Sequence, residues 1–125
     1  MPGATRIAAI KATKTVTIST ATDGQSAEVD LKGFELEAIQ MPAAWTAAAI
    51  TFLGSDVAAG TFNDVYDSGG TELNLTVAAA RMIGLTEAHR AVLKALRFIK
   101  IRSGTSGTPV VQAASRTLIL VFKSK

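Results

Sequence analysis

The sequence predicts an all-β protein, an antiparallel β-sandwich of the jelly-roll kind with one short helix near residues 86–95. Its most frequent local pattern is alternation of apolar and polar residues with period two, bounded by Gly, Ser, Asp and Pro. About eight such segments follow one another at intervals of about 8 to 15 residues, and a helical pattern appears once. Parallel α/β folds need a helix after nearly every strand, so they are excluded.

The first half of the chain predicts four strands. The segment 14–20 alternates Val16 and Ile18 with hydroxyl residues. After the turn signal at residues 23–24 a second run begins, and Gly33 marks a bulge or a break in it. Beyond Gly33, the three residues Phe34, Leu36 and Ala38 are expected to share one face. The last of the four strands is expected at residues 45–53, and a helix over residues 42–50 is the alternative.

The second half predicts the remaining strands and the helix. Alternation predicts short strands at 61–66 and 73–77 with the turn Asp67-Ser68-Gly69-Gly70 between them. Thr86 is the expected helix N-cap, and alanines at spacings of three and four, together with Val92, are the expected buried face: Ala88, Ala91 and Ala95. A strand at 97–102, a loop at 103–109, an edge pairing at 110–114 and a buried closing strand at 116–123 follow.

A length of 125 residues favours one domain. Residues 13–125 are expected to form this β-sandwich domain, and residues 1–12 an N-terminal arm. The arm holds the apolar residues 7–10, which would be a liability in water and an anchor on a partner. No stretch is long and apolar enough for a membrane span, and the start of the chain does not have the pattern of a signal peptide.

The composition excludes several common kinds of functional site. The chain has no Cys and one His, so it offers no thiol nucleophile, disulfide or Cys/His zinc site. Residues 1–62 carry 4 basic and 6 acidic side chains, and residues 63–125 carry 9 and 4. The basic stretch from Arg90 to Arg102 has a single aromatic residue, Phe98, which favours a solvated or protein-contacting face over nucleic-acid binding.

Four features of the sequence are candidate chemical sites. Asp64 and Asp67 are the local oxygen cluster, interpreted as turn caps with calcium ligation as the alternative. Trp45 is interpreted as a core residue, with a sugar-stacking platform or a partner contact as the alternative. His89 is expected on the helix surface, and Gly104 belongs to a loop that lacks the lysine and helix of a phosphate-binding loop. We therefore expect no enzyme, no cofactor and no metal.

Three segments resemble small structural proteins of tailed bacteriophages and prophages: residues 41–52, residues 62–67 with the Gly-Gly turn, and residues 97–110. The resemblance covers residues 25–123. It implies a virion component with a β-sandwich fold, serving as a capsid decoration (cement) protein or as a small tail-associated module. No catalytic motif comes with it.

From this resemblance we expect a decoration protein on the outer capsid surface, made in the host bacterial cytoplasm, that stabilises contacts between capsomers. Its expected partners are the major capsid protein and copies of itself, as a trimer in preference to a dimer, with no nucleic acid and no membrane. The alternative is a carbohydrate- or receptor-binding module of a tail fibre or baseplate. The side chains expected to contact a partner are Ile7, Ile10, Trp45, Arg97, Lys100, Arg102 and Phe122.

Overall fold

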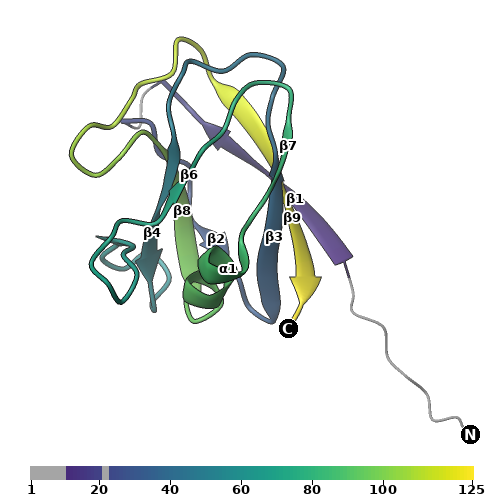
Figure 1. Cartoon of the computed structure of the whole chain (residues 1–125), viewed down its shortest axis with the longest axis vertical. Coiled ribbons are helices and arrows are strands. Elements are labelled where there is room, and N and C mark those ends of the chain that lie inside the picture. The colour runs from purple at the N-terminus through teal and green to yellow at the C-terminus, as the bar shows by residue number, and fades with distance from the viewer. Residues whose placement is uncertain (1–10, 21–22) are drawn as a thin grey trace, which may run out of the picture.

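The computed structural model of the chain describes residues 11–20 and 23–125, which form two antiparallel β-sheets packed face to face (Figure 1). One sheet, called sheet A, has the strand order β1-β9-β3-β7, and the other, sheet B, has the order β2-β8-β4-β5 with β6 also paired to β4. The elements are β1 Lys11–Ile18, β2 Val29–Asp30, β3 Phe34–Gln40, β4 Ile50–Ser55, β5 Asn63–Asp64, β6 Asn74–Leu75, β7 Met82–Gly84, α1 Glu87–Leu93, β8 Phe98–Ser103 and β9 Arg116–Ser124.

This strand order is that of a jelly roll. Apart from the short β6, strands pair from the outside of the sequence inwards: β1 with β9, β2 with β8, β3 with β7 and β4 with β5, all antiparallel. The chain changes sheet at nearly every connection, as two interlocked Greek keys require. The predicted all-β sandwich with one short helix is therefore confirmed.

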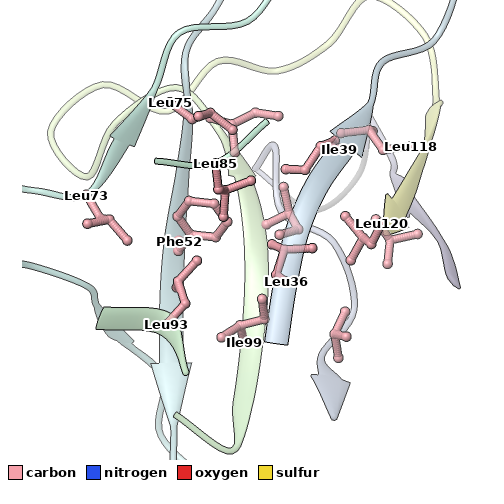
Figure 2. Packing of buried hydrophobic residues seen from close by; sticks show 14 of the residues in the cluster. Leu36, Ile39, Phe52, Leu73, Leu75, Leu85, Leu93, Ile99, Leu118 and Leu120 are labelled. Carbon is pink, nitrogen blue, oxygen red and sulfur yellow. The ribbon is translucent and has the colours of Figure 1, made fainter. Parts of the chain in front are cut away.

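The core lies between the two sheets (Figure 2). Sheet A contributes Leu36, Ile39 and Leu120, and sheet B contributes Phe52 and Ile99, each at most 1 % exposed. Since strand side chains alternate between faces, every second residue of β9 points inwards, and the buried residues there are 118, 120 and 122. The closing strand predicted at 116–123 is confirmed, and it lies inside sheet A between β1 and β3.

The alternation predicted for β3 is wrong after Leu36. Gly33, with φ of 72°, forms the turn between β2 and β3, where the N–H of Phe34 donates to the carbonyl of Leu31 at 2.7 Å. The bulge occurs later, because the pairing with β9 shifts between Leu36 and Ala38. The extra residue moves Ala38 to the outer face and brings Ile39 into the core.

The helix begins where predicted and buries a different face. Thr86 is the N-cap, and its hydroxyl accepts from the N–H of His89 at 3.1 Å. The buried helix residue is Leu93, at 1 % exposure, whereas the three alanines expected to face the core are exposed. Seven residues make about two turns, so a single large side chain anchors the helix more effectively than a stripe of methyl groups.

Several predicted boundaries also differ. β1 starts at Lys11, so residues 11 and 12 of the expected arm belong to a strand, and Ile7 and Ile10 lie outside the described residues. Residues 42–49 are neither strand nor helix, and β4 starts at Ile50. The strands expected at 61–66 and 73–77 shrink to β5 and β6, segment 110–114 forms no strand, and β7 had not been predicted.

Candidate functional site

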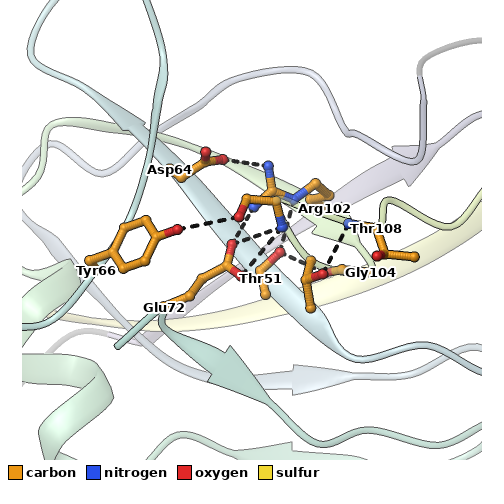
Figure 3. Close-up of polar contacts among 9 residues, drawn as sticks. Thr51, Asp64, Tyr66, Glu72, Arg102, Gly104 and Thr108 are labelled. Atoms are coloured by element: carbon orange, nitrogen blue, oxygen red, sulfur yellow. Dashed lines mark hydrogen bonds and ion pairs between the residues drawn. The ribbon is translucent and has the colours of Figure 1, made fainter. Parts of the chain in front are cut away.

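The most buried charge among the described residues is that of Arg102, whose side chain is 4 % exposed on the outer side of sheet B (Figure 3). Its guanidinium donates to Thr51 Oγ1 at 2.9 Å, to Asp64 Oδ1 at 2.5 Å and to Glu72 Oε2 at 2.6 Å. Two carboxylates and a hydroxyl thus satisfy the buried cation. Arg102, expected to contact a partner, has little surface left for one.

The same cluster fixes the loop after β8. The Glu72 carboxylate accepts the N–H of Ser106 at 3.0 Å, and the Ser106 hydroxyl lies 3.3 Å from that of Tyr66. Thr51 donates to the carbonyl of Gly104 at 2.7 Å. Gly104 has φ of 94°, and a Cβ there would lie 2.5 Å from a backbone oxygen, so the loop requires glycine. This network holds structure together and leaves its carboxylates occupied.

The Asp67 turn caps itself. Asp67 Oδ1 accepts the N–H groups of Gly69 at 2.9 Å and Thr71 at 3.0 Å, which is the geometry of an aspartate turn. Asp64, the other member of the predicted oxygen cluster, is bound to Arg102. Within residues 11–20 and 23–125 no three His, Asp or Glu side chains are grouped to hold a metal ion. The turn interpretation fits this geometry better than calcium ligation.

Trp45 lies at the edge of the core, half-buried, and lines a cavity of about 360 Å³. Its indole N–H donates to the carbonyl of Ala48 at 3.0 Å. The remaining lining is apolar or small: Ala47, Ala48, Ala49, Thr76, Val77, Ala78 and Ala79. A sugar site surrounds such a ring with several polar groups that bind hydroxyls, and this wall offers few of them.

Three other predicted contact residues are placed differently from one another. Phe122 is 6 % exposed and packs edge-on against Phe34, with ring centroids 6.3 Å apart, so it is a core residue. Lys100 lies over the Phe62 ring, with Nζ 4.6 Å from the centroid. Arg97 is 46 % exposed and is therefore accessible, although its guanidinium is bound to an aspartate. The members of the predicted set that the structure describes therefore do not form one surface.

Much of the basic stretch from Arg90 to Arg102 is neutralised within the chain. Arg90 lies 3.8 Å from Glu35 and 3.6 Å from Glu37, and Arg102 is paired as described above. Arg97 Nε lies 2.7 Å from Asp30 Oδ1. The hydrogen bond from the Arg97 guanidinium and a second one from the backbone N–H of Lys32 lower the pKa of Asp30 to about 2. Nucleic-acid binding needs several unpaired cations to contact phosphate groups, and the described residues of this stretch do not present such an array.

One exposed surface had not been predicted: the outer face of sheet A. It consists of outward-pointing residues of four neighbouring strands, most of them exposed, and it is uncharged except at one end, where Lys11, Glu35 and Lys123 lie. We call it the sheet A face, and its members are Thr13, Thr15, Thr17, Ala38, Gln40, Met82, Gly84, Thr117, Ile119 and Val121. The hydroxyl side of the first predicted strand was a signal of it, but sequence alone does not say that four such strand faces adjoin.

Comparison with known proteins gives a likeness in fold. No protein-family model matches the chain, and no curated protein matches it. Among solved structures, it is similar to the crystal structure of the SPBc2 prophage-derived protein YomS, with a TM-score of 0.52 and 13% sequence identity. The alignment covers 96% of this chain and 100% of that one. At this identity the shared property is the fold, and the likeness extends over nearly all of this chain.

The described residues contain no helix of the length and apolarity needed to cross a membrane.

Proposed function

We propose that this chain is a structural protein of a phage particle and acts as a decoration protein on the outside of the assembled head. The observation that carries this proposal is the end-to-end likeness in fold to a prophage-derived protein. It agrees with the resemblance of three sequence segments to phage virion proteins. A decoration protein needs stability and contact area and requires no active site.

The state of the polar side chains supports a structural role over an enzymatic one. The carboxylates of Asp64 and Glu72 are bound to Arg102. His89 is engaged in the helix cap through Thr86, with its Nδ1 2.9 Å from the Thr86 hydroxyl. These groups hold loops and helix ends in place, so we propose that the protein is not an enzyme.

The proposed partner is the major capsid protein, bound on the outer surface of the head after assembly in the host bacterial cytoplasm. Neither nucleic acid nor membrane is proposed as a partner. The pairing of Arg90, Arg97 and Arg102 with acidic side chains supports this, because it neutralises three of the five basic side chains in the stretch 90–102 that could have bound phosphates.

The rival function is a carbohydrate- or receptor-binding module of a tail fibre or baseplate. Its two predicted site features were Trp45 and the loop of residues 64–70. The apolar lining beside Trp45 and the occupied oxygens of Asp64 and Asp67 favour the decoration role over this one.

The test is co-sedimentation of the purified protein with expanded, empty capsids and, in parallel, with isolated tails of the same phage. We expect saturable binding to capsids at a fixed copy number per particle and none to tails. Binding to tails alone, or binding to glycan arrays, would support the rival module instead. The position of the gene beside the major capsid gene or among tail genes is an independent check.

A further inference from the structure

The two sheets differ in what covers their outer faces. On sheet B, the outward residues Thr51, Leu53 and Arg102 are 0 %, 8 % and 3 % exposed, so other parts of the chain cover them. On sheet A, no outward residue between Thr13 and Thr17 is buried, and Met82 is 60 % exposed. In the described structure the outer face of sheet B is therefore covered by other parts of the chain, and the outer face of sheet A is exposed.

The sheet A face has the uneven surface, with high and low positions side by side, that packing against another sheet requires. Across the strands its rows run Thr13, Val121, Ala38, Gly84 and, one step along, Thr15, Ile119, Gln40, Met82. The large apolar side chains of β9 form a ridge. Beside it, Ala38 and Gly84 form one low row across β3 and β7, and a Cβ added at Gly84 would meet nothing within 4 Å; the next row, Gln40 and Met82, stands higher. Val121 of the ridge and the low position Ala38 beside it are complementary about a twofold axis between β9 and β3.

We propose that the sheet A face packs against the same face of a second copy, about a twofold axis parallel to the strands and between β9 and β3. This rotation places the β9 ridge of each copy over β3 of the other, so that Val121 lies over Ala38 of the partner and Ile119 lies over its Gln40. Two sheets in contact at an angle of about 30° give the ordinary packing of a β-sandwich. A twofold axis closes at two copies, so the inference selects the dimer over the trimer expected from the sequence.

The charges at one end of the face decide the direction of the axis. Lys123 of β9 pairs in register with Glu35 of β3, and its ammonium lies 3.9 Å from Glu37. Both glutamates also lie within 4 Å of Arg90 of their own chain. With the axis along the strands, Lys123 of each copy lies over the acidic side chains of this cluster in the other, which favours this direction. Lys11 is exposed at the corner of the face and can extend into water.

The alternative twofold axis, perpendicular to the strands within the plane of the interface, is unfavourable for two reasons. It would set the β9 ridges of both copies against each other. It would also place the charged end of each face against the uncharged end of the other, near Thr17 and Thr117, and so desolvate charges without partners.

The size of the face predicts a weak dimer. Four strands about 4.8 Å apart and five residues with a rise of about 3.4 Å give roughly 300 Å² per copy. A stable interface buries roughly 800 Å² per partner. We therefore expect association that depends strongly on concentration and becomes significant where many copies are held close together.

The first test is sedimentation velocity of the full chain over a concentration series, with a matched pair of variants. Val121→Lys puts an ammonium into the centre of the face, and Val111→Lys makes the same change at a residue 52 % exposed outside it. We expect Val121→Lys to weaken self-association by about tenfold or more and Val111→Lys to leave it unchanged. Gln40→Lys, at an exposed position of the face, repeats the test without touching a half-buried residue.

The second test exploits the charge pairing. Lys123→Glu and Glu35→Lys each create repulsion across the proposed axis when the variant meets itself. A mixture of the two restores opposite charges at both contacts, so heterodimers should form where neither variant dimerises alone. Loss of association in the mixture as well would exclude this axis.

A monomer at every concentration, or equal effects of Val121→Lys and Val111→Lys, would overturn the proposal. So would a purified monomer whose binding to capsids is abolished by Val121→Lys, because the face would then belong to the capsid protein. None of these results depends on the decoration role, since the dimer is measured without capsids. Failure of capsid binding with an intact dimer would remove the proposed function alone.

Discussion

The side-chain amide of Gln112 pairs with the backbone of Thr46 in the way that two neighbouring strand residues pair. Its Oε1 accepts the N–H of Thr46 at 2.7 Å, and its Nε2 donates to the carbonyl of Thr46 at 3.0 Å. The same Nε2 donates to the hydroxyl of Ser103 at 2.7 Å. Because Gln112 is 1 % exposed, this amide acts as a buried clasp between two long loops at one end of the sandwich.

The first prediction is that Gln112→Leu lowers the free energy of unfolding by about 2 to 3 kcal/mol. Leucine has a side chain of similar size, but it leaves the part-buried N–H and carbonyl of Thr46 without the amide that binds them, which is the costly outcome for a hydrogen bond. Urea unfolding followed by the fluorescence of Trp45 measures it. Val111→Ala at the neighbouring exposed position should change stability by less than about 0.5 kcal/mol. Wild-type stability of Gln112→Leu would mean that the loops are held by other contacts.

The second prediction concerns the two carboxylates on Arg102. Glu72, 15 % exposed, and Asp64, 37 % exposed, bind the same guanidinium. Glu72→Gln should cost about 3 kcal/mol of unfolding free energy, because it leaves a buried cation with one carboxylate and loosens the Ser106 loop. Asp64→Asn should cost about 1 kcal/mol, since water reaches that contact. Chemical denaturation of both variants decides the order, and a larger loss for Asp64→Asn would contradict it.

Sequence patterns predicted the sandwich, the turn at Asp67 and the helix N-cap at Thr86, because each of these depends on residues close together in the chain. Patterns could not predict features set by distant partners. The bulge after Leu36 is a shift in the pairing of β3 with β9, and the burial of Arg102 depends on carboxylates from two other parts of the chain. For the same reason, a stretch that reads as a basic patch is largely neutral in the folded chain.

The candidate contact residues illustrate the same limit. Phe122 was expected at a partner surface because it ends an apolar strand, but the strand lies in the middle of sheet A and turns its ring into the core. The sheet A face went unpredicted because its rows consist of one residue from each of four strands. A period of two identifies the outer side of each strand, and only the register between strands joins those sides into one surface.

The third prediction is a pKa change at an exposed ion pair. Asp30, whose pKa is about 2 instead of its ordinary 3.8, is held down first by the hydrogen bond from Arg97. Because the folded value is lowered, the pair stabilises the fold above pH 3.8, and this contribution is lost as the pH falls towards 2. Arg97→Gln should raise the pKa of Asp30 towards 3.8, while the N–H of Lys32 retains part of the lowering.

Carbon-13 NMR titration of the Asp30 carboxyl measures this change. Lys100→Gln is the matched control: it removes one positive charge three residues further along the chain, in β8, and that charge lies over Phe62 rather than beside Asp30. The pKa of Asp30 should stay near 2 in this control. An equal rise in both variants would show that general charge, and not the specific hydrogen bond, lowers the value.

The last prediction is that residues 2–10 contribute to capsid binding and not to the stability of the domain. All core residues of the described structure lie at Val16 or later, so deleting residues 2–10 should leave the melting temperature of the domain nearly unchanged. The sheet A face contains none of these residues, so self-association should also persist. Capsid binding should weaken, because an apolar segment with Ile7 and Ile10 supplies contact area on a partner.

Ile7→Ser together with Ile10→Ser in the full chain should weaken capsid binding in the same way, which ties the effect to the apolar side chains. Unfolding of the shortened chain would instead make this segment a strand of the core, and full capsid binding would assign the contact to another surface.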